Sequence, residues 1–179
     1  MNAPADPVNT EGWFVNTPGV KKGGAFPKLV PFFLTPEAQA DLRAKAHSWL
    51  GTPFHPLGRV KGAGVDCVHL WAEIMVECGH ITGYQFPRYQ IDGGHHAAQS
   101  HLYEWLSSHP GYVELVPGAP NIPGDLLLYR MGRCAHHLAG CVGSPHGIHC
   151  LQGGRVIGMN MDDATFAKRF ACAFRPVFW

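Results

Sequence analysis

The sequence predicts an α+β domain in which N-terminal helices pack on an antiparallel β-sheet. Segments with apolar residues at helical spacing come first, and short apolar or alternating runs bounded by Gly, Pro or Asn follow from residue 125. The 22 glycines and 15 prolines predict many turns between these runs. A chain of 179 residues that is 46% hydrophobic can bury one sizeable core.

Residues 1–34 are predicted to form an extended arm in front of a domain at 35–179. The arm is rich in Pro, Gly and Asn, and its aromatic residues are Trp13, Phe14, Phe26, Phe32 and Phe33. Polar linkers rarely contain so many aromatic side chains, so we expect the arm to pack on its own domain or on a partner.

The clearest helix is predicted over 35–50. Thr35 can cap its N-terminus, Pro36 suits the first turn, and Gly51 ends it. The side chains expected on its apolar face are Ala38, Leu42, Ala46, Trp49 and Leu50. The segment 52–64, rich in Pro and Gly, is predicted to be a loop.

Two further helices are predicted over 66–78 and 96–109, and a short one over 161–170. The apolar stripe of the helix at 66–78 is expected to be Val68, Trp71, Ala72, Met75 and Val76. The expected strands cover 125–131, 137–143, 147–152, 155–160 and 172–179. Helices followed by strands in this order are typical of an α+β domain.

The charge and cysteine patterns exclude several classes of protein. Fourteen basic and 13 acidic residues are scattered without a basic stripe, so we expect no nucleic-acid partner. Six dispersed cysteines without a Cys-x-x-Cys pair indicate mostly free thiols in a reducing cytoplasm rather than a disulfide scaffold or a structural zinc site. The start of the chain lacks the charge and apolar run of a secretory signal, and no run approaches the ~18 residues that a membrane span needs.

Cys67 is the first candidate for chemistry, because it follows a glycine-rich loop at the predicted start of a helix. Backbone N–H groups and the helix dipole at that position favour a thiolate and can hold an oxyanion. Asp66 is expected to cap the helix, and Gly64 lets the backbone approach a substrate closely. The alternative is that Cys67 is simply a small apolar residue at a helix start.

A nucleophilic cysteine needs a base, which is usually histidine, and the base needs an orienting group. His136 and His137 open a predicted strand, and His149 lies in the next one. If these two strands pair antiparallel, His137 and His149 come close together, although the register is open at this point.

The motifs "AHSWLGTPF", "KGAGVDCVHLW", "GDLLLYRM", "HHLAGCVG" and "GIHC" follow one another in this order. From about residue 38 to 179 the chain resembles the NlpC-type family of papain-like cell-wall cysteine peptidases, in particular its phage-tail branch. The resemblance implies a papain-like fold with Cys67 as nucleophile, His137 as general base and His149 as the residue that orients the base. It also implies that Asp125 is structural and that no metal or cofactor is needed.

Three residues depart from the family pattern. Many members have Tyr where this chain has Phe54, which lacks the hydroxyl that helps near the oxyanion. Many have a small residue where this chain has His69, which can crowd the cleft or contact substrate. His136 lies beside the expected base and can contribute to binding.

The function implied by the resemblance is hydrolysis of an amide bond in the peptidoglycan stem peptide, by a phage or phage-like tail component that assists cell-wall penetration. The protein would then be made in the cytoplasm and carried in the virion tail, with residues 1–34 binding tail hub or tip proteins and no part inserted in a membrane. Three alternatives stay open: a structural tail-tip module with weak or no activity, a metal-binding protein, and a cytoplasmic amidase or acyltransferase.

Overall fold

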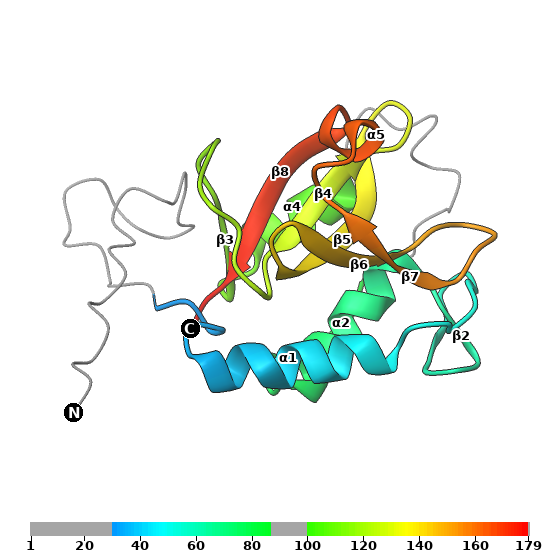
Figure 1. The fold of residues 1–179 in the computed structure, drawn as a ribbon, viewed down its shortest axis with the longest axis horizontal. Coiled ribbons are helices and arrows are strands. Elements are labelled where there is room, and N and C mark those ends of the chain that lie inside the picture. The colour runs from blue at the N-terminus through cyan, green and yellow to red at the C-terminus, as the bar shows by residue number, and fades with distance from the viewer. Residues whose placement is uncertain (1–29, 87–99, 179) are drawn as a thin grey trace.

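A computed structural model describes residues 30–86 and 100–178 (Figure 1). The helices are α1 (Pro36–Ser48), α2 (Cys67–Glu77), α4 (His101–Ser108) and α5 (Ala164–Ala167). The strands are β1 (Arg59–Val60), β2 (Gly64–Val65), β3 (Tyr112–Glu114), β4 (Leu126–Arg130), β5 (Ala135–Gly143), β6 (His146–Cys150), β7 (Val156–Asn160) and β8 (Phe170–Pro176).

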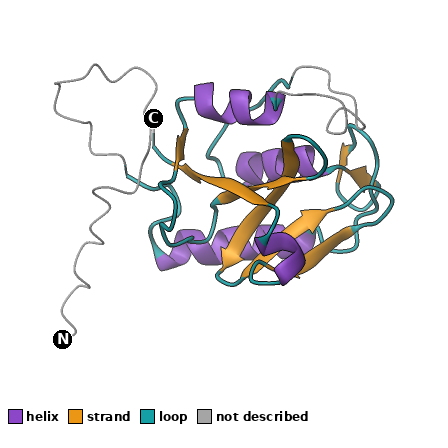
Figure 2. Ribbon diagram, turned by 90° about the horizontal axis from the view of Figure 1, so that it is seen from above, coloured by secondary structure: helices purple, strands orange, loops and turns teal. Residues whose placement is uncertain are grey.

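The six longer strands form one antiparallel sheet in the order β3-β8-β4-β5-β6-β7. In Figures 1 and 2, α1 and α2 lie on one side of this sheet and the small helix α5 lies on the other. The predicted α+β class, with N-terminal helices on an antiparallel sheet, is confirmed.

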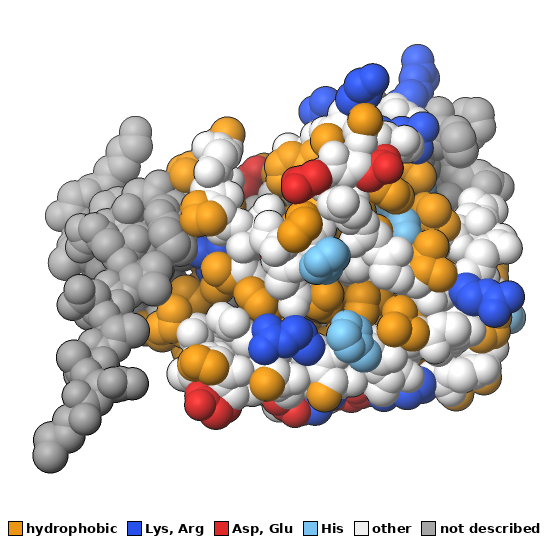
Figure 3. All heavy atoms as spheres, viewed as in Figure 1, with side chains coloured by type: hydrophobic (Ala, Val, Ile, Leu, Met, Phe, Trp, Pro, Cys, Tyr) orange, Lys and Arg blue, Asp and Glu red, His pale blue; other side chains and the backbone are white. Residues whose placement is uncertain are grey.

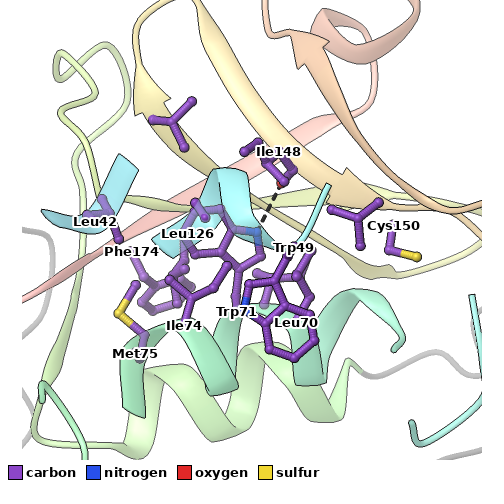
Figure 4. Packing of buried hydrophobic residues seen from close by; sticks show 14 of the residues in the cluster. Leu42, Trp49, Leu70, Trp71, Ile74, Met75, Leu126, Ile148, Cys150 and Phe174 are labelled. Carbon is purple, nitrogen blue, oxygen red and sulfur yellow. Dashed lines mark hydrogen bonds between the residues drawn. The ribbon is translucent and has the colours of Figure 1, made fainter. Parts of the chain in front are cut away.

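The main core lies between the helices and the sheet (Figure 4). Trp71 of α2 is fully buried there, and its Nε1–H donates to the backbone oxygen of Ile148 in β6 at 3.0 Å. Gly140 of β5 lies directly under the indole, where any side chain would collide with the ring. This close fit fixes α2, and therefore the residue at its N-terminus, against β5 and β6.

A second, smaller cluster covers the opposite face of the sheet. It consists of Leu115, Leu127, Tyr129, Ala139, Cys141, Met159 and Ala173, with Phe166 of α5 packed against it. The sheet is therefore buried on both faces, and residues that alternate along β5 face different clusters.

The two long predicted helices start where the capping signals place them. The Thr35 hydroxyl accepts the N–H of Ala38, and the Asp66 carboxylate accepts the N–H groups at the start of α2. Leu50 was wrongly predicted to join the apolar face: it follows the end of α1 and is 47% exposed. The predicted stripe of α2 was too narrow, since Leu70 and Ile74 are also fully buried.

Other boundaries also differ from the sequence prediction. The segment 52–64 is not only loop, because Arg59–Val60 pairs with Gly64–Val65 in a small hairpin. β3 was not predicted, and β8 begins at Phe170 rather than at 172. The helix expected over 96–109 is observed as α4, and its first four predicted residues lie outside the described part of the chain.

The end of the predicted arm packs onto the domain. Phe32 donates its N–H to the oxygen of Pro176 at 2.9 Å, and Phe33 is 2% exposed. The Phe33 ring lies against Gly124, whose φ of +97° and lack of a side chain are both required there. Residues 30–34 therefore belong to the folded unit, and residues 1–29 lie outside the described residues.

Candidate active site

Cys67 is the first residue of α2, and Asp66 is the N-cap before it. Asp66 Oδ1 accepts the backbone N–H of Val68 at 3.1 Å and that of His69 at 2.9 Å. The half-buried Cys67 sulfur instead faces its own N–H and the backbone N–H of Leu138 in β5. The Asp66 carboxylate is thus bonded to the N–H groups of the two residues after Cys67, and the Cys67 N–H lies beside the sulfur.

The pKa of the Cys67 thiol is raised to about 12, because burial disfavours the thiolate and the Asp66 charge repels it. The N–H groups of Leu138 and of Cys67 itself oppose this rise. The thiol is therefore protonated near neutral pH, and it needs a base that removes its proton during attack.

His137 and His149 form a buried pair on neighbouring strands. The register places Ala139 opposite His149, so that both histidines lie on the face of the second cluster. His137 Nε2 and His149 Nδ1 are 3.0 Å apart, and the residues are 4% and 1% exposed. The expectation that these two side chains meet is confirmed.

Both rings are neutral near neutral pH. Burial is the main cause that lowers the pKa of His137 to about 3, with smaller contributions from His149 and His136. Burial also lowers the pKa of His149 to about 4. One ring must then donate its N–H to the other, and only a proton on His137 Nε2 leaves a lone pair on His137 Nδ1.

Cys67 and the histidine pair approach the same end of β5 from different sides. The pairing of β5 with β6 ends at Ala139 and His149, and one residue further the N–H of Leu138 faces the Cys67 sulfur. Cys150, the last residue of β6, donates its thiol to the oxygen of Val65 at 3.5 Å. Among the described residues, no hydrogen bond joins the Cys67 sulfur to the His137 ring.

His69 lies beneath the N-terminus of α2 rather than in open solvent, at 8% exposure. Its Nδ1 is 2.9 and 3.0 Å from the two carboxylate oxygens of Asp66. Its ring also contacts Tyr84 and Phe86, with ring centroids 5.8 Å apart in both cases. Sequence reasoning missed this pairing with Asp66, although an Asp-x-x-His spacing at a helix start was a signal for it.

The remaining predicted site residues are Phe54, Gly64 and His136. Phe54 is half-buried against the main core, and its N–H donates to the oxygen of Gly154 at 2.9 Å. Gly64 lies in β2, where a Cβ would be 2.5 Å from His55 Cβ, so it serves a close contact inside the chain. The half-buried His136 contributes to the low pKa of His137.

Asp125 forms a structural ion pair away from the cysteine. Arg175 Nε and Nη2 donate to its two oxygens at 2.8 and 2.7 Å, and both residues are fully buried. The Ile122 N–H donates to the same carboxylate at 2.8 Å. These bonds hold the start of β4 against β8.

A separate groove of about 340 Å³ lies between α1 and the β6–β7 region. Its lining includes His47 and His146, and histidine side chains are visible on both sides of the hollow in Figure 3. None of the predicted site residues lines it.

Three further findings concern the described ranges as a whole. No group of three or more His, Cys, Asp or Glu side chains within them is placed to hold a metal ion. None of their helices is long and apolar enough to cross a membrane. All six cysteines lie in these ranges and are free thiols.

The chain has the papain-like fold that NlpC/p60 domains have. The NlpC/p60 domain of the peptidoglycan hydrolase SagA is 20% identical with a TM-score of 0.50, and the match covers 75% of this chain and 96% of that one. A lipoprotein-like protein of the NLP/P60 family from Staphylococcus aureus is 17% identical with a TM-score of 0.57, over 83% of this chain and 44% of that one. An NlpC/P60 family protein from Bacillus cereus is 21% identical with a TM-score of 0.51, over 75% and 39%.

No protein-family model and no curated protein matches the sequence. This chain spans nearly the whole SagA domain but less than half of the two other proteins. At these identities the likeness establishes a common fold, and the chemistry rests on the residues of the site.

Proposed function

We propose that this protein is a cysteine peptidase that hydrolyses an amide bond in the peptidoglycan stem peptide. The observation that carries the proposal is the position of Cys67 at a helix N-terminus, facing the backbone one residue from a buried, hydrogen-bonded histidine pair. The SagA domain, which has the same fold, belongs to a protein described as a peptidoglycan hydrolase.

In the proposed reaction, His137 Nδ1 removes the Cys67 proton while the sulfur attacks the amide carbon. The electron pair of the C=O bond moves to oxygen, and the Cys67 N–H stabilises that oxyanion. His137 then gives the proton to the leaving nitrogen as the C–N bond breaks. Water, deprotonated by His137, releases the acyl group from the thioester and restores the thiol.

His149 has the orienting role in this scheme. Its Nδ1 lone pair accepts the His137 Nε2–H, and this keeps the lone pair of His137 on Nδ1. A His137–Cys67 hydrogen bond must form when substrate binds, because none joins these two side chains in the free protein. Catalytic hydrogen bonds are often long in free enzymes and shorten in the substrate complex.

The test is digestion of purified peptidoglycan by the wild-type protein and by Cys67→Ala, with mass spectrometry of the released fragments. Cys78→Ala is the matched control, because Cys78 is a second half-buried thiol at the other end of the same helix. Stem-peptide fragments from wild type and Cys78→Ala, but not from Cys67→Ala, would support the peptidase and identify its bond. Blank digests from the folded wild type would favour a structural module of the same fold.

We further propose that the enzyme acts as a component of a phage or phage-like tail, and that its N-terminal segment binds the tail hub or tip. The order of its motifs supports this placement. A deletion of residues 1–29 is the suitable test, because Phe33 is a core residue and must stay. The truncated protein should fold and digest peptidoglycan but fail to enter tails, and normal incorporation would refute the role of the segment.

A further inference from the structure

The Asp66–His69 pair lies beside the nucleophile but has no part in the proposed reaction steps. Asp66 is 2% exposed, and within the described ranges its carboxylate accepts hydrogen bonds from the N–H groups of Val68 and His69, from the N–H of Leu57 at 2.8 Å, and from the His69 ring nitrogen. A buried carboxylate with this many donors is held ionised. Its negative charge stands next to the cysteine.

That charge has two opposing effects on Cys67. The capping bonds create the helix start on which the cysteine depends. The same charge works against the thiolate that must form during attack, and it acts here together with burial. A hydrogen-bond donor that draws the Asp66 charge away from the sulfur would reduce the repulsion of the thiolate without removing the cap.

His69 has the geometry of such a donor. An ionised carboxylate only accepts hydrogen bonds, so His69 Nδ1 carries a proton and shares it between the two Asp66 oxygens at 2.9 and 3.0 Å. Tyr84 and Phe86 contact the imidazole ring, and its burial keeps water from replacing it at the carboxylate.

We propose that His69 is a positioning residue that holds and offsets the Asp66 carboxylate, and thereby lowers the free-energy cost of forming the Cys67 thiolate. The proposal deepens the proposed function and rests on it for its biological meaning. Within residues 30–86 and 100–178, the other ionisable groups on the elements around Asp66 and His69 include Cys150 at the end of β6, His137 with His136 on β5, and Tyr84 with its partners Glu73 and Arg59. The variants below leave all of these unchanged.

The test is the rate of Cys67 alkylation by iodoacetamide at about pH 8, followed by mass spectrometry of the peptide that contains Cys67. His69→Phe keeps an aromatic ring against Tyr84 and Phe86 but loses the N–H. Loss of the donor should slow alkylation about tenfold, the change that one unit of thiol pKa gives. Asp66→Asn should speed it, because Asn caps helices as well as Asp does but carries no charge.

The double variant Asp66→Asn/His69→Phe separates charge from access. If His69 acts on the Asp66 charge, His69→Phe has no effect on alkylation once Asp66→Asn has removed the carboxylate. An unchanged rate in the folded single variant His69→Phe would overturn the proposal, and so would an equal slowing in both backgrounds, which indicates altered access. His69→Gln, which keeps a side-chain N–H donor, should slow alkylation less than His69→Phe does.

The alkylation rates of these variants do not depend on peptidoglycan. If the rates change as expected while wild-type digests stay blank, the proposed function fails and the electrostatic role of His69 stands. If peptidoglycan is digested but the alkylation rates do not change as expected, only the role of His69 is lost.

Discussion

A single methyl group at Gly140 is expected to disturb the contact that fixes the cysteine helix on the sheet. A Cβ at this position would lie 2.5 Å from Trp71 Cη2, and still closer to two other atoms of the ring. An ordinary contact is about 3.5 Å or longer, so ring or strand must move by roughly 1 Å. The indole has no room to move, because it is fully buried and bonded to Ile148.

We therefore expect Gly140→Ala to lower the free energy of unfolding by about 1–3 kcal/mol, the usual cost of overpacking a close-packed core. Guanidinium denaturation followed by tryptophan fluorescence measures this change. Gly158→Ala is the matched control, because Gly158 also lies in a strand of this sheet. The atom nearest to its new Cβ would be the backbone oxygen of Gly147, at an ordinary contact distance of 3.9 Å. The control should change stability by less than about 0.5 kcal/mol.

Whether the collision with Trp71 causes the loss of stability can be tested by replacing the indole ring. Trp71→Phe alone loses packing and the bond to Ile148, and it should cost about 2–4 kcal/mol. In that background Gly140→Ala should cost less than it does with Trp71 present, because the methyl enters space that the indole has left. Equal stability of Gly140→Ala and Gly158→Ala would refute the reasoning, as would strict additivity with Trp71→Phe.

Three further predictions follow from buried polar groups. Arg175→Met leaves the buried Asp125 carboxylate without its partner and should cost about 3–5 kcal/mol in a denaturant titration, with partial recovery in Arg175→Met/Asp125→Asn. The lowered pKa values of His80, His137 and His149, about 4, 3 and 4, mean that the unfolded chain binds protons below about pH 6.5 and the folded chain does not. The free energy of unfolding should be highest above that pH and should fall between about pH 6.5 and about pH 4, by about 1.4 kcal/mol per pH unit for each histidine. Denaturant midpoints that do not change over this pH range would contradict the prediction. His149→Ala should lower the rate of stem-peptide release about 10²–10⁴-fold with little change in KM, because the His137 Nε2–H loses its acceptor, and His149→Gln should retain more activity than His149→Ala.

The parts of the fold that sequence could predict are those with local signals. Thr35 and Asp66 mark helix starts because a capping side chain acts within three residues of its own position. His137 and His149 could be paired because a short turn connects their strands. β3 escaped prediction because it has three residues and pairs with β8, about sixty residues away in the chain.

Contacts between distant residues were out of reach of pattern reasoning. Gly140 looks like a weak point of a strand until the Trp71 ring is placed on it. Arg175 is a lone charge in an apolar run, and only the sheet order β8-β4 brings it to Asp125. In both cases the role of the residue depends on a contact with a partner that is distant in the sequence, and the position of that partner depends on the whole fold.

The relation of Cys67 to His137 follows from where the pairing of β5 with β6 stops. The histidines lie on the face of the second cluster, whereas α2 packs on the main core. In the proposed reaction they can act together only because the pairing of β5 with β6 ends at Ala139 and His149, which leaves the Leu138 N–H to the cysteine sulfur. A shift of one residue in this register would turn His149 to the other face and separate it from His137. The register of β6, held by the Trp71 bond to Ile148, is therefore as necessary to the proposed chemistry as the identity of the three side chains.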